Sequence, residues 1–318
     1  MTVELKNLKK EILFYYESRQ NPNGDPGFEN QPRLMPDGTI LVTDVRIKRT
    51  IRGYAKNKLH ETLFVDYGED GVPVTADARA KEIVKKGENI ATGLLQRTFD
   101  TPLFGALVTI RSEEEGSAQK VTGPVQFGIG RSVNQVQIIN PMISGRFVGK
   151  VKKGAQEQFS TFGKFYSVEY ALIKIQGIVN PLNLSQFLEN KDIVKKYSDA
   201  ESKLFECLWN GTNSLVSRSK YPQRSIFFLE VSYDGAIYND LPLLVEENPA
   251  VKEKITTLPS SPLKFEKLLE AVKTRRKLIV NVRVAACHEL QPDASGLVEK
   301  LRNDKIPSEL IRPEEIQS

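Results

Sequence analysis

The chain has 318 residues, with 45 Lys and Arg against 40 Asp and Glu and a formal net charge of +5. Its 40% hydrophobic and 27% charged residues form an ordinary globular mixture, which excludes wholesale disorder. No apolar run approaches the ~18 residues of a membrane-spanning helix, and residues 1–16 lack a signal-peptide pattern. We therefore expect a soluble, cytoplasmic protein with no membrane partner.

Two cysteines and two histidines limit the chemistry that the chain can support. They exclude a disulfide framework and make a His-rich or Cys-based metal site improbable on composition. Cys287 and His288 are adjacent, and neighbours on a strand face opposite sides, so they do not form a nucleophile–base pair. The sequence predicts no catalytic residue, no metal and no cofactor.

The first predicted elements are extended. Residues 11–17 (EILFYYE) form a short aromatic and β-branched run, typical of a strand. Residues 21–27 (NPNGDPG) are dense in turn-forming residues, because Asn-Gly accepts positive φ and each proline restricts its neighbour. Residues 39–42 form a second short extended piece.

A helix is predicted from Thr43 or Asp44, either of which can cap the first amides. Ile47, Ile51 and Tyr54 fall on one helical face, which we expect to pack on the core. Residues 44–60 hold six Lys and Arg and a single Asp, a local excess equal to that of the whole chain. We expect these cations to form a basic arc that faces outward, which suggests a polyanionic partner.

The middle of the chain reads as two insertions between strands. Residues 63–119 show helical patterning at 76–84 and 90–99 and are interpreted as an insertion with a small helical core. Residues 121–134 read as a glycine-interrupted strand. Residues 140–163 are glycine-rich and basic, which indicates a protruding loop or hairpin, and residues 164–176 alternate as a strand does.

The last third contains a helix and two strands. Ser198 and Glu201 form a capping-box pattern that predicts a helix over residues 198–215, with Trp209 on its core face. Residues 225–233 and 277–285 are apolar runs that predict strands. Residues 289–318 are polar, interrupted by prolines and more acidic than basic, and are interpreted as a poorly fixed tail.

Without the two insertions, the predicted strands and helices follow one another in the order β-α-β-β-α-β. It predicts an α+β fold of the ferredoxin-like or RNA-recognition-motif type, an antiparallel sheet with two helices on one face. An open sheet face in such a fold is a common platform for single-stranded RNA.

Several segments resemble one family. The runs NPNGDP (21–26) and VTDVRIKRTIRGY (42–54) resemble the N-terminal signature of the CRISPR Cascade backbone subunit, in the type I-B and I-C branch of the RAMP superfamily. TGPVQFGIGRSVN (122–134), TFGKFYSVEYAL (161–172) and WNGTNSLVSRSK (209–220) are similar to its later motifs. The likeness extends over about residues 12–284.

The resemblance implies a modified RNA-recognition-motif palm with a helical finger insertion and a thumb hairpin. The corresponding parts are palm at 1–62, 121–131 and 162–288, a finger-like insertion at 63–120, a thumb-like hairpin at 132–161 and a polar tail at 289–318. It implies a helical filament of copies along a CRISPR guide RNA, presentation of that guide to target DNA, and other Cascade subunits as partners.

A protein that holds many guide sequences contacts phosphate and sugar and leaves the base edges free. From the charges and the matching motifs together, the residues predicted to contact RNA are Arg19, Asn21, Asn23, Arg46, Lys48, Arg49, Arg52, Lys56, Arg131, Ser132, Arg146, Lys164 and Arg218.

Two alternatives remain open at this point. Related type III backbones cut target RNA with an acidic loop residue, and the loop after the first strand here holds Asp25, Glu29 and Asp37. A metal-dependent ribonuclease would need these ligands to converge. The other alternative is a stand-alone single-stranded RNA-binding protein with an open sheet. Phe165 and Tyr166 are adjacent in its strand and would face opposite sides, which makes a poor stacking pattern.

Overall fold

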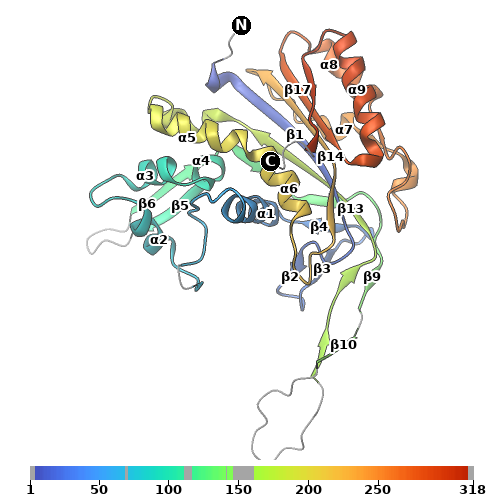
Figure 1. The fold of residues 1–318 in the computed structure, drawn as a ribbon, viewed down its shortest axis with the longest axis horizontal. Helices are drawn as coiled ribbons and strands as arrows, with labels where there is room; N and C mark the ends of the chain where they lie inside the picture. Colours follow the sequence, from blue (N-terminus) through green and yellow to red (C-terminus); the bar gives the residue numbers. More distant parts are fainter. Residues whose placement is uncertain (1–3, 69–70, 111–116, 141, 146–160, 314–318) are drawn as a thin grey trace, which may run out of the picture.

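A sheet of ten strands runs through the centre of the computed structural model, which describes residues 4–68, 71–110, 117–140, 142–145 and 161–313 (Figure 1). Its strand order is β18-β17-β14-β1-β13-β8-β4-β3-β2, and β7 also pairs with β13. The strands are β1 (Leu8–Ser18), β2 (Gly24–Asp25), β3 (Gln31–Leu34), β4 (Ile40–Val42), β7 (Val125–Phe127), β8 (Gly130–Ser132), β13 (Ala171–Val179), β14 (Gln223–Asp234), β17 (Ile279–Ala286) and β18 (Ser308–Leu310).

Helices cover one face of the centre of this sheet. They are α1 (Asp44–Asn57), α5 (Lys191–Ser202) and α6 (Leu204–Asn213), and α1 packs against α6. From β1, Phe14 and Tyr16 enter this core, where they meet Ile51 of α1 and Trp209 of α6. The predicted core position of Trp209 is confirmed, and so are the strands predicted at 11–17, 225–233 and 277–285.

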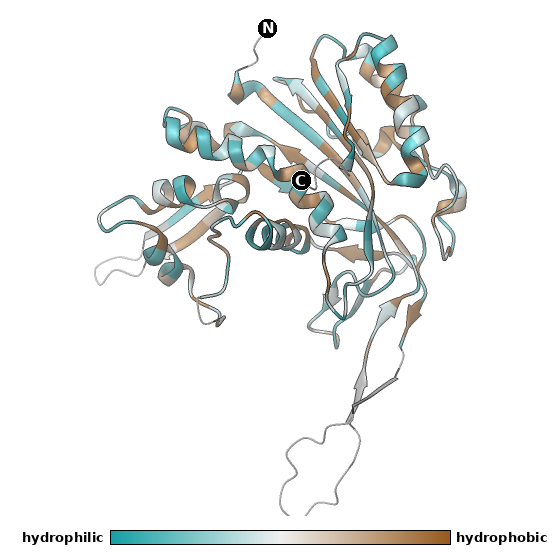
Figure 2. Cartoon of the chain, viewed as in Figure 1, coloured by the Kyte–Doolittle hydropathy of each residue, from teal (hydrophilic) through white to brown (hydrophobic). Residues whose placement is uncertain are grey.

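The other face of the sheet is covered as well. Leu13 and Tyr15 alternate with the previous set and enter a second core with Leu268 and Leu297. The covering helices are α7 (Leu241–Leu244), α8 (Glu266–Thr274) and α9 (Gln291–Asn303), with the small pair β15 (Glu246–Glu247) and β16 (Leu263–Lys264). Figure 2 shows hydrophobic residues along the central strands between the two helical layers. An open sheet face, as the stand-alone RNA-binding alternative requires, is therefore absent over β1 and β14 among the described residues.

The prediction of a loose tail after residue 289 is wrong. Residues Gln291–Asn303 form α9, which buries Ala294, Leu297, Val298 and Leu301, and β18 then pairs in parallel with β17. The prolines were misread as breaks, but Pro292 lies in the first turn of α9, where a missing amide costs little.

The capping box predicted at Ser198 is also wrong. The helix begins at Lys191, where the side chain of Asn190 accepts hydrogen bonds from the amides of Asp192 and Ile193. Ser198 lies inside α5, and Lys203 separates α5 from α6.

The segment interpreted as an insertion forms α2 (Ala76–Ile83), α3 (Ile90–Arg97), α4 (Asp100–Phe104) and the hairpin of β5 (Gly105–Ile110) and β6 (Ser117–Thr122). The helical patterning at 76–84 and 90–99 is confirmed. A small core of Phe64, Ala80, Leu94 and Val108 joins helices and hairpin. The hairpin was not predicted, and it lies with α2 and α3 at one side of the molecule (Figure 1).

A second projection leaves the sheet between β8 and β13. Strand β9 (Ile138–Ile139) pairs with β12 (Ser167–Val168), and β10 (Met142–Gly145) pairs with β11 (Thr161–Lys164). The hairpin predicted at 140–163 is thus present at its base, and in Figure 1 it extends away from the sheet. Residues 146–160, with the predicted site residue Arg146, lie outside the described residues.

The short 3-10 helices are η1 (Leu5–Asn7), η2 (Pro181–Phe187), η3 (Pro249–Val251) and η4 (His288–Leu290).

Candidate nucleic-acid interface

Helix α1 begins where the sequence predicts, and the loop after β1 holds its first turn. The Thr43 hydroxyl accepts a hydrogen bond from the Arg46 amide. Asn23 accepts hydrogen bonds from the Thr43 amide and hydroxyl, at 2.8 and 2.9 Å. Ile47, Ile51 and Ala55 are buried against the sheet. Asn23, a predicted RNA contact, therefore already has a structural partner.

One side of α1 faces the insertion, and its cations are neutralised there. The Arg52 guanidinium donates to Asp100 of α4 at 2.7 Å, and both side chains are buried. The Lys48 ammonium lies 3.0 Å from Asp44, and that of Lys56 lies 2.5 Å from Asp66. We call Lys48, Arg52 and Lys56 the paired cations. The prediction that they form one outward-facing basic arc is wrong, because each is paired with a carboxylate and only Lys56 is exposed.

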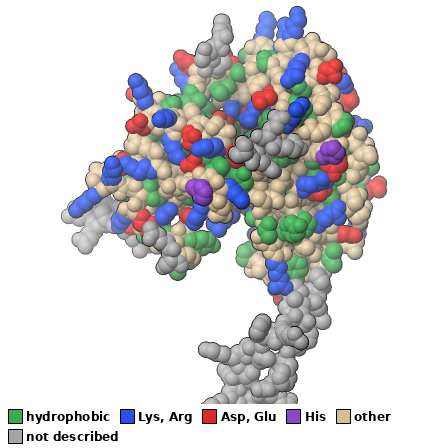
Figure 3. Space-filling model, in the orientation of Figure 1, with side chains coloured by type: hydrophobic (Ala, Val, Ile, Leu, Met, Phe, Trp, Pro, Cys, Tyr) green, Lys and Arg blue, Asp and Glu red, His purple; other side chains and the backbone are tan. Residues whose placement is uncertain are grey.

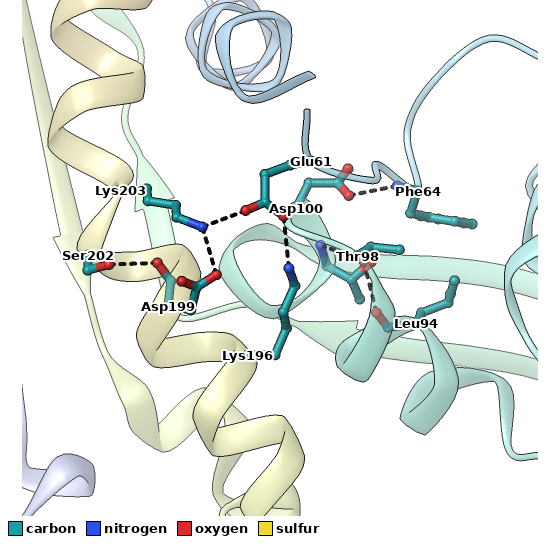
Figure 4. A network of polar contacts seen from close by, with 10 residues as sticks. Glu61, Phe64, Leu94, Thr98, Asp100, Lys196, Asp199, Ser202 and Lys203 are labelled. Atoms are coloured by element: carbon teal, nitrogen blue, oxygen red, sulfur yellow. Dashed lines mark hydrogen bonds and ion pairs between the residues drawn. The ribbon is translucent and has the colours of Figure 1, made fainter. Parts of the chain in front are cut away.

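Two carboxylates organise the junction of α1, the insertion and α5 (Figure 4). Asp100 fastens the insertion to α1: it accepts the Arg52 guanidinium and the amides of Phe64 and Val65, at 2.7 and 3.1 Å for the amides. Glu61, between α1 and the insertion, lies between the ammonium groups of Lys196 on α5 and Lys203 just after it, at 2.9 and 2.6 Å. Burial would raise the pKa of Glu61, but the hydrogen bonds and charges of the two lysines outweigh it and lower that pKa.

The other side of α1 borders a pocket of about 660 Å³. We call it the loop pocket. It is enclosed by the loop after β1, the residues before β12 and the turn between α6 and β14. Its lining residues are Asn21, Asn23, Gly24, Glu29, Asn30, Phe165, Tyr166, Ser217, Arg218, Ser219 and Lys220. A Cβ on Gly24 would stand 2.6 Å from the Asn30 carbonyl oxygen, so only glycine fits this wall.

Three cations without carboxylate partners, Arg46, Arg218 and Lys220, lie at or beside the loop pocket, and a fourth, Arg49, lies on α1 against the insertion. The Lys220 ammonium donates to the Asn21 carbonyl at 2.6 Å, and the Arg46 guanidinium donates to the Pro22 carbonyl at 3.2 Å. Arg218 is exposed and stacks over the Phe165 ring at 5.6 Å, and Arg49 stacks over Tyr67 at 5.3 Å. None of these four forms an ion pair with a described carboxylate. We call Arg46, Arg49, Arg218 and Lys220 the unpaired cations.

Crowding of positive charge perturbs the buried members of this group. Burial and the nearby Arg46 charge lower the pKa of Lys220 to about 8. Burial also lowers the pKa of Arg46, with the Arg49 charge adding to it and Tyr16 opposing it. A site that holds desolvated cations without ion-pair partners favours the binding of an external anion.

Asn21 ties the two walls of the loop pocket together. Its amide donates to the Ser219 carbonyl at 3.0 Å, and its side-chain nitrogen donates to the Asn30 carbonyl. Only 4% of Asn21 is exposed, and its side-chain oxygen has no donor among the described residues. Sequence reasoning placed Asn21 at the site, and the structure shows that it shapes the pocket wall.

The remaining predicted residues lie apart from the loop pocket. Arg19 is exposed at the end of β1 and stacks over the Tyr170 ring at 5.1 Å. Arg131 donates to Thr39 and pairs with Asp37 on the exposed side of β8. Ser132 is buried, accepting from the Ile40 amide at 3.0 Å. Lys164 belongs to the β11 ladder, but its side chain lies outside the described part.

Lys220 was missed by sequence reasoning, although a signal was present. The turn SRSK carries two cations, Arg218 and Lys220, shortly before Pro222, and only Arg218 was selected from it. What distinguishes Lys220 is its proximity to Asn21 and Arg46, which pairing of β1 with β14 brings about.

The loop carboxylates do not converge. Asp25 accepts from Arg33 at 2.9 Å, Glu29 accepts from the Tyr166 hydroxyl at 3.1 Å, and Asp37 lies beside Arg131 and Thr39. The described residues contain no group of three or more His, Cys, Asp or Glu side chains that could hold a metal ion. Nor do the described helices include one long and apolar enough to cross a bilayer.

The cations are not spread as one basic surface. On the face shown in Figure 3, Lys and Arg are interspersed with Asp and Glu. The loop pocket differs from this mixture because its cations lack internal partners. Fold and site together define a class of protein with a mixed sheet covered by helices on both faces and a cation-lined pocket beside it.

Comparison with known proteins identifies the family. The family model for CRISPR-associated protein Cas7 matches residues 8–266, so the chain belongs to the Cas7 family. A CRISPR-associated protein Cas7 from Haloferax volcanii is 24% identical over 336 residues, covering 95% of this chain and 93% of the relative.

Among solved structures, a chain of a CRISPR RNA-guided surveillance complex, pre-nicking, is similar in fold. It has a TM-score of 0.53 and 13% identity, and the match covers 97% of this chain and 98% of that one. A chain of a second CRISPR RNA-guided surveillance complex has a TM-score of 0.49 and 13% identity, with 96% of each chain covered.

Proposed function

We propose that this protein is a backbone subunit of a type I CRISPR interference complex, Cascade, and binds the guide RNA without reading its sequence. Family membership supports the class of function. The observation that carries the RNA-binding assignment is the group of Arg46, Arg218 and Lys220 at the loop pocket, which have no ion-pair partner among the described carboxylates. Copies of the chain would follow one another along the guide and present it to target DNA, together with other Cascade subunits.

The chemistry of the pocket supports contact with the backbone of RNA. Arginine and lysine bind phosphate through charge-assisted hydrogen bonds, and Ser217 and Ser219 add hydroxyls to the same wall. Such contacts leave base edges free to pair with a target strand.

The folding units suggest how the subunit is divided. Strands β14, β1, β13 and β8 lie in that order and are connected through α1 and α5–α6, with these helices on one face. This order supports the assignment of a modified RNA-recognition-motif palm. We assign residues 63–120 as fingers and residues 132–161 as the thumb, on the strength of their positions between palm strands.

A non-catalytic role fits the described loop best. Asp25, Glu29 and Asp37 each contact a different donor, which does not support the ribonuclease alternative. Incubation of the assembled complex with complementary RNA and Mg²⁺ or Mn²⁺ tests this point. Periodic cuts that disappear on Asp25→Ala would reverse the assignment.

A salt titration tests RNA binding itself. We expect affinity for single-stranded RNA to fall by roughly 0.7 log units per log unit of salt for each neutralised phosphate. Two unrelated RNAs of equal length are expected to bind alike at every salt concentration. Strong preference for one RNA with a slope near zero would show base-edge reading and contradict the backbone role. A copurifying RNA of fixed length would support it directly.

A further inference from the structure

Lys220 stands out among the cations of the molecule. Three other lysines of low exposure have carboxylates beside them: Lys10 lies 2.5 Å from Glu201, Lys174 lies 2.6 Å from Glu247, and Lys196 lies 2.9 Å from Glu61. Lys220 instead donates to a neutral carbonyl and has a guanidinium as its charged neighbour. A buried ammonium in such surroundings is destabilised by desolvation and by like charge.

The charged and titratable groups around Lys220 come from four segments. Arg46 approaches from α1 and Arg218 lies on the same turn, so both are positive. Glu29, from the loop between β2 and β3, lines the pocket and accepts the Tyr166 hydroxyl, which belongs to the segment before β12. The cationic wall formed by Arg46, Arg218 and Lys220 therefore lacks an ion-pair partner within the described residues.

We propose that the Lys220 ammonium is a direct ligand of a guide-RNA phosphodiester in the loop pocket, and that it takes up a proton when RNA binds. This inference rests on the proposed function. It adds the atom that contacts the phosphate, Lys220 Nζ, and a coupling between RNA binding and protonation of that atom. A phosphodiester oxygen beside Lys220 supplies the ion-pair partner that this ammonium lacks among the described residues.

The direction of the pH effect on RNA affinity follows from the pKa of Lys220 in the free protein and in the RNA complex. In the free protein the pKa of Lys220 lies at about 8, because of burial and the Arg46 charge. A bound phosphate favours the ammonium and raises that pKa. Below about pH 8 the lysine is already protonated, so its titration makes no contribution to the pH dependence of affinity. Above about pH 8 binding requires proton uptake, so affinity falls by up to tenfold per pH unit.

Three variants of the full-length chain separate charge from structure. Lys220→Met removes the ammonium, and Lys220→Arg keeps a charge that does not titrate in this range. Lys277→Met is the matched control, because Lys277 is an exposed lysine far from the loop pocket. Lys277 lies near the last residues of β14, whereas Lys220 lies just before the first residue of that strand. Circular dichroism and melting temperature verify that each variant folds.

The measurement is fluorescence anisotropy of labelled oligoadenylate, whose bases do not titrate between about pH 7 and 9.5. We expect wild type and Lys277→Met to lose affinity above about pH 8, and Lys220→Arg to show a flat profile. We expect Lys220→Met to bind about tenfold more weakly at pH 7, also with a flat profile. Calorimetry at about pH 8.5 in two buffers of different ionisation enthalpy is expected to show proton uptake by wild type but not by Lys220→Arg.

The outcomes distinguish this inference from the proposed function. If folded Lys220→Met binds RNA as wild type does, or if Lys220→Arg keeps the wild-type pH profile, Lys220 is not the ligand, whereas the guide-binding role stands. If wild type does not bind single-stranded RNA at any salt concentration, the proposed function fails, and this inference fails with it.

Discussion

Helix α1 carries cations on two sides, and the two sides have opposite surroundings. On the side of the insertion, each of the paired cations lies within 3.0 Å of a carboxylate, from Asp44, Asp100 or Asp66. Toward the loop pocket, Arg46 meets a carbonyl and a hydroxyl, and Arg49 stacks over the Tyr67 ring of the insertion; neither forms an ion pair with a described carboxylate. The difference teaches that positive charge in a sequence indicates an anion partner only after internal carboxylates have been counted.

The largest expected effect concerns the buried pair. Asp100→Ala leaves the Arg52 guanidinium buried without its carboxylate and removes the acceptor of two amides. We expect a loss of about 3–5 kcal/mol of unfolding free energy, measured by urea denaturation. Asp77→Ala, which breaks an exposed pair with Lys81, is the control and is expected to cost below ~0.5 kcal/mol. Equal losses in the two variants would show that Asp100 is not a structural anchor.

Two double variants, each of which removes two positive charges, compare the unpaired with the paired cations in RNA binding. Arg49→Gln with Arg218→Gln removes two unpaired cations, and Lys48→Gln with Lys56→Gln removes two paired ones. We expect the first pair to weaken single-stranded RNA binding by roughly 10–100-fold and the second by less than about threefold. Filter binding at fixed salt measures both. A greater loss with the lysine variants would restore the basic arc on the insertion side.

The smallest expected effect is the acid response of the Glu61 contact. The pKa of Glu61 is lowered in the folded protein, so its contribution to stability is present above its ordinary pKa and is lost as the pH falls below it. Because Glu61 is partly exposed, we expect ~1 kcal/mol or less. Glu61→Gln is expected to lower the melting temperature near neutral pH and to converge with wild type in acid. A constant difference at all pH values would assign the effect to packing.

The core elements were predictable because their patterns are local. Residues 12–16 form an uninterrupted apolar run, and β1 is buried on both faces from residue 10 onward. Thr43 caps α1 as its position before an amphipathic repeat indicates. The helices of the insertion were found for the same reason, because α2 and α3 carry a 3.6-residue periodicity of their own.

The site was less predictable because its partners are distant in sequence. A helical wheel orients Arg52 but contains no information on Asp100, 48 residues later. Lys220 acquires its character from Asn21, 199 residues earlier. The prediction of a poorly fixed tail at residues 289–318 was wrong because a proline is compatible with a helix start as well as with a break. Only the burial of Leu297 and Leu301 in α9 shows that Pro292 lies at a helix start.

Strand β18 has a consequence for how copies of the chain can meet. It covers the outer edge of β17 with three residues, and one of them, Glu309, is charged and exposed. A short, charged strand is a poor template for joining sheets edge to edge. We therefore expect copies of the chain on a guide to contact one another through side chains and RNA, and not by pairing strands at this edge. Such an assembly can end with the guide, whereas edge-to-edge growth would have no natural length.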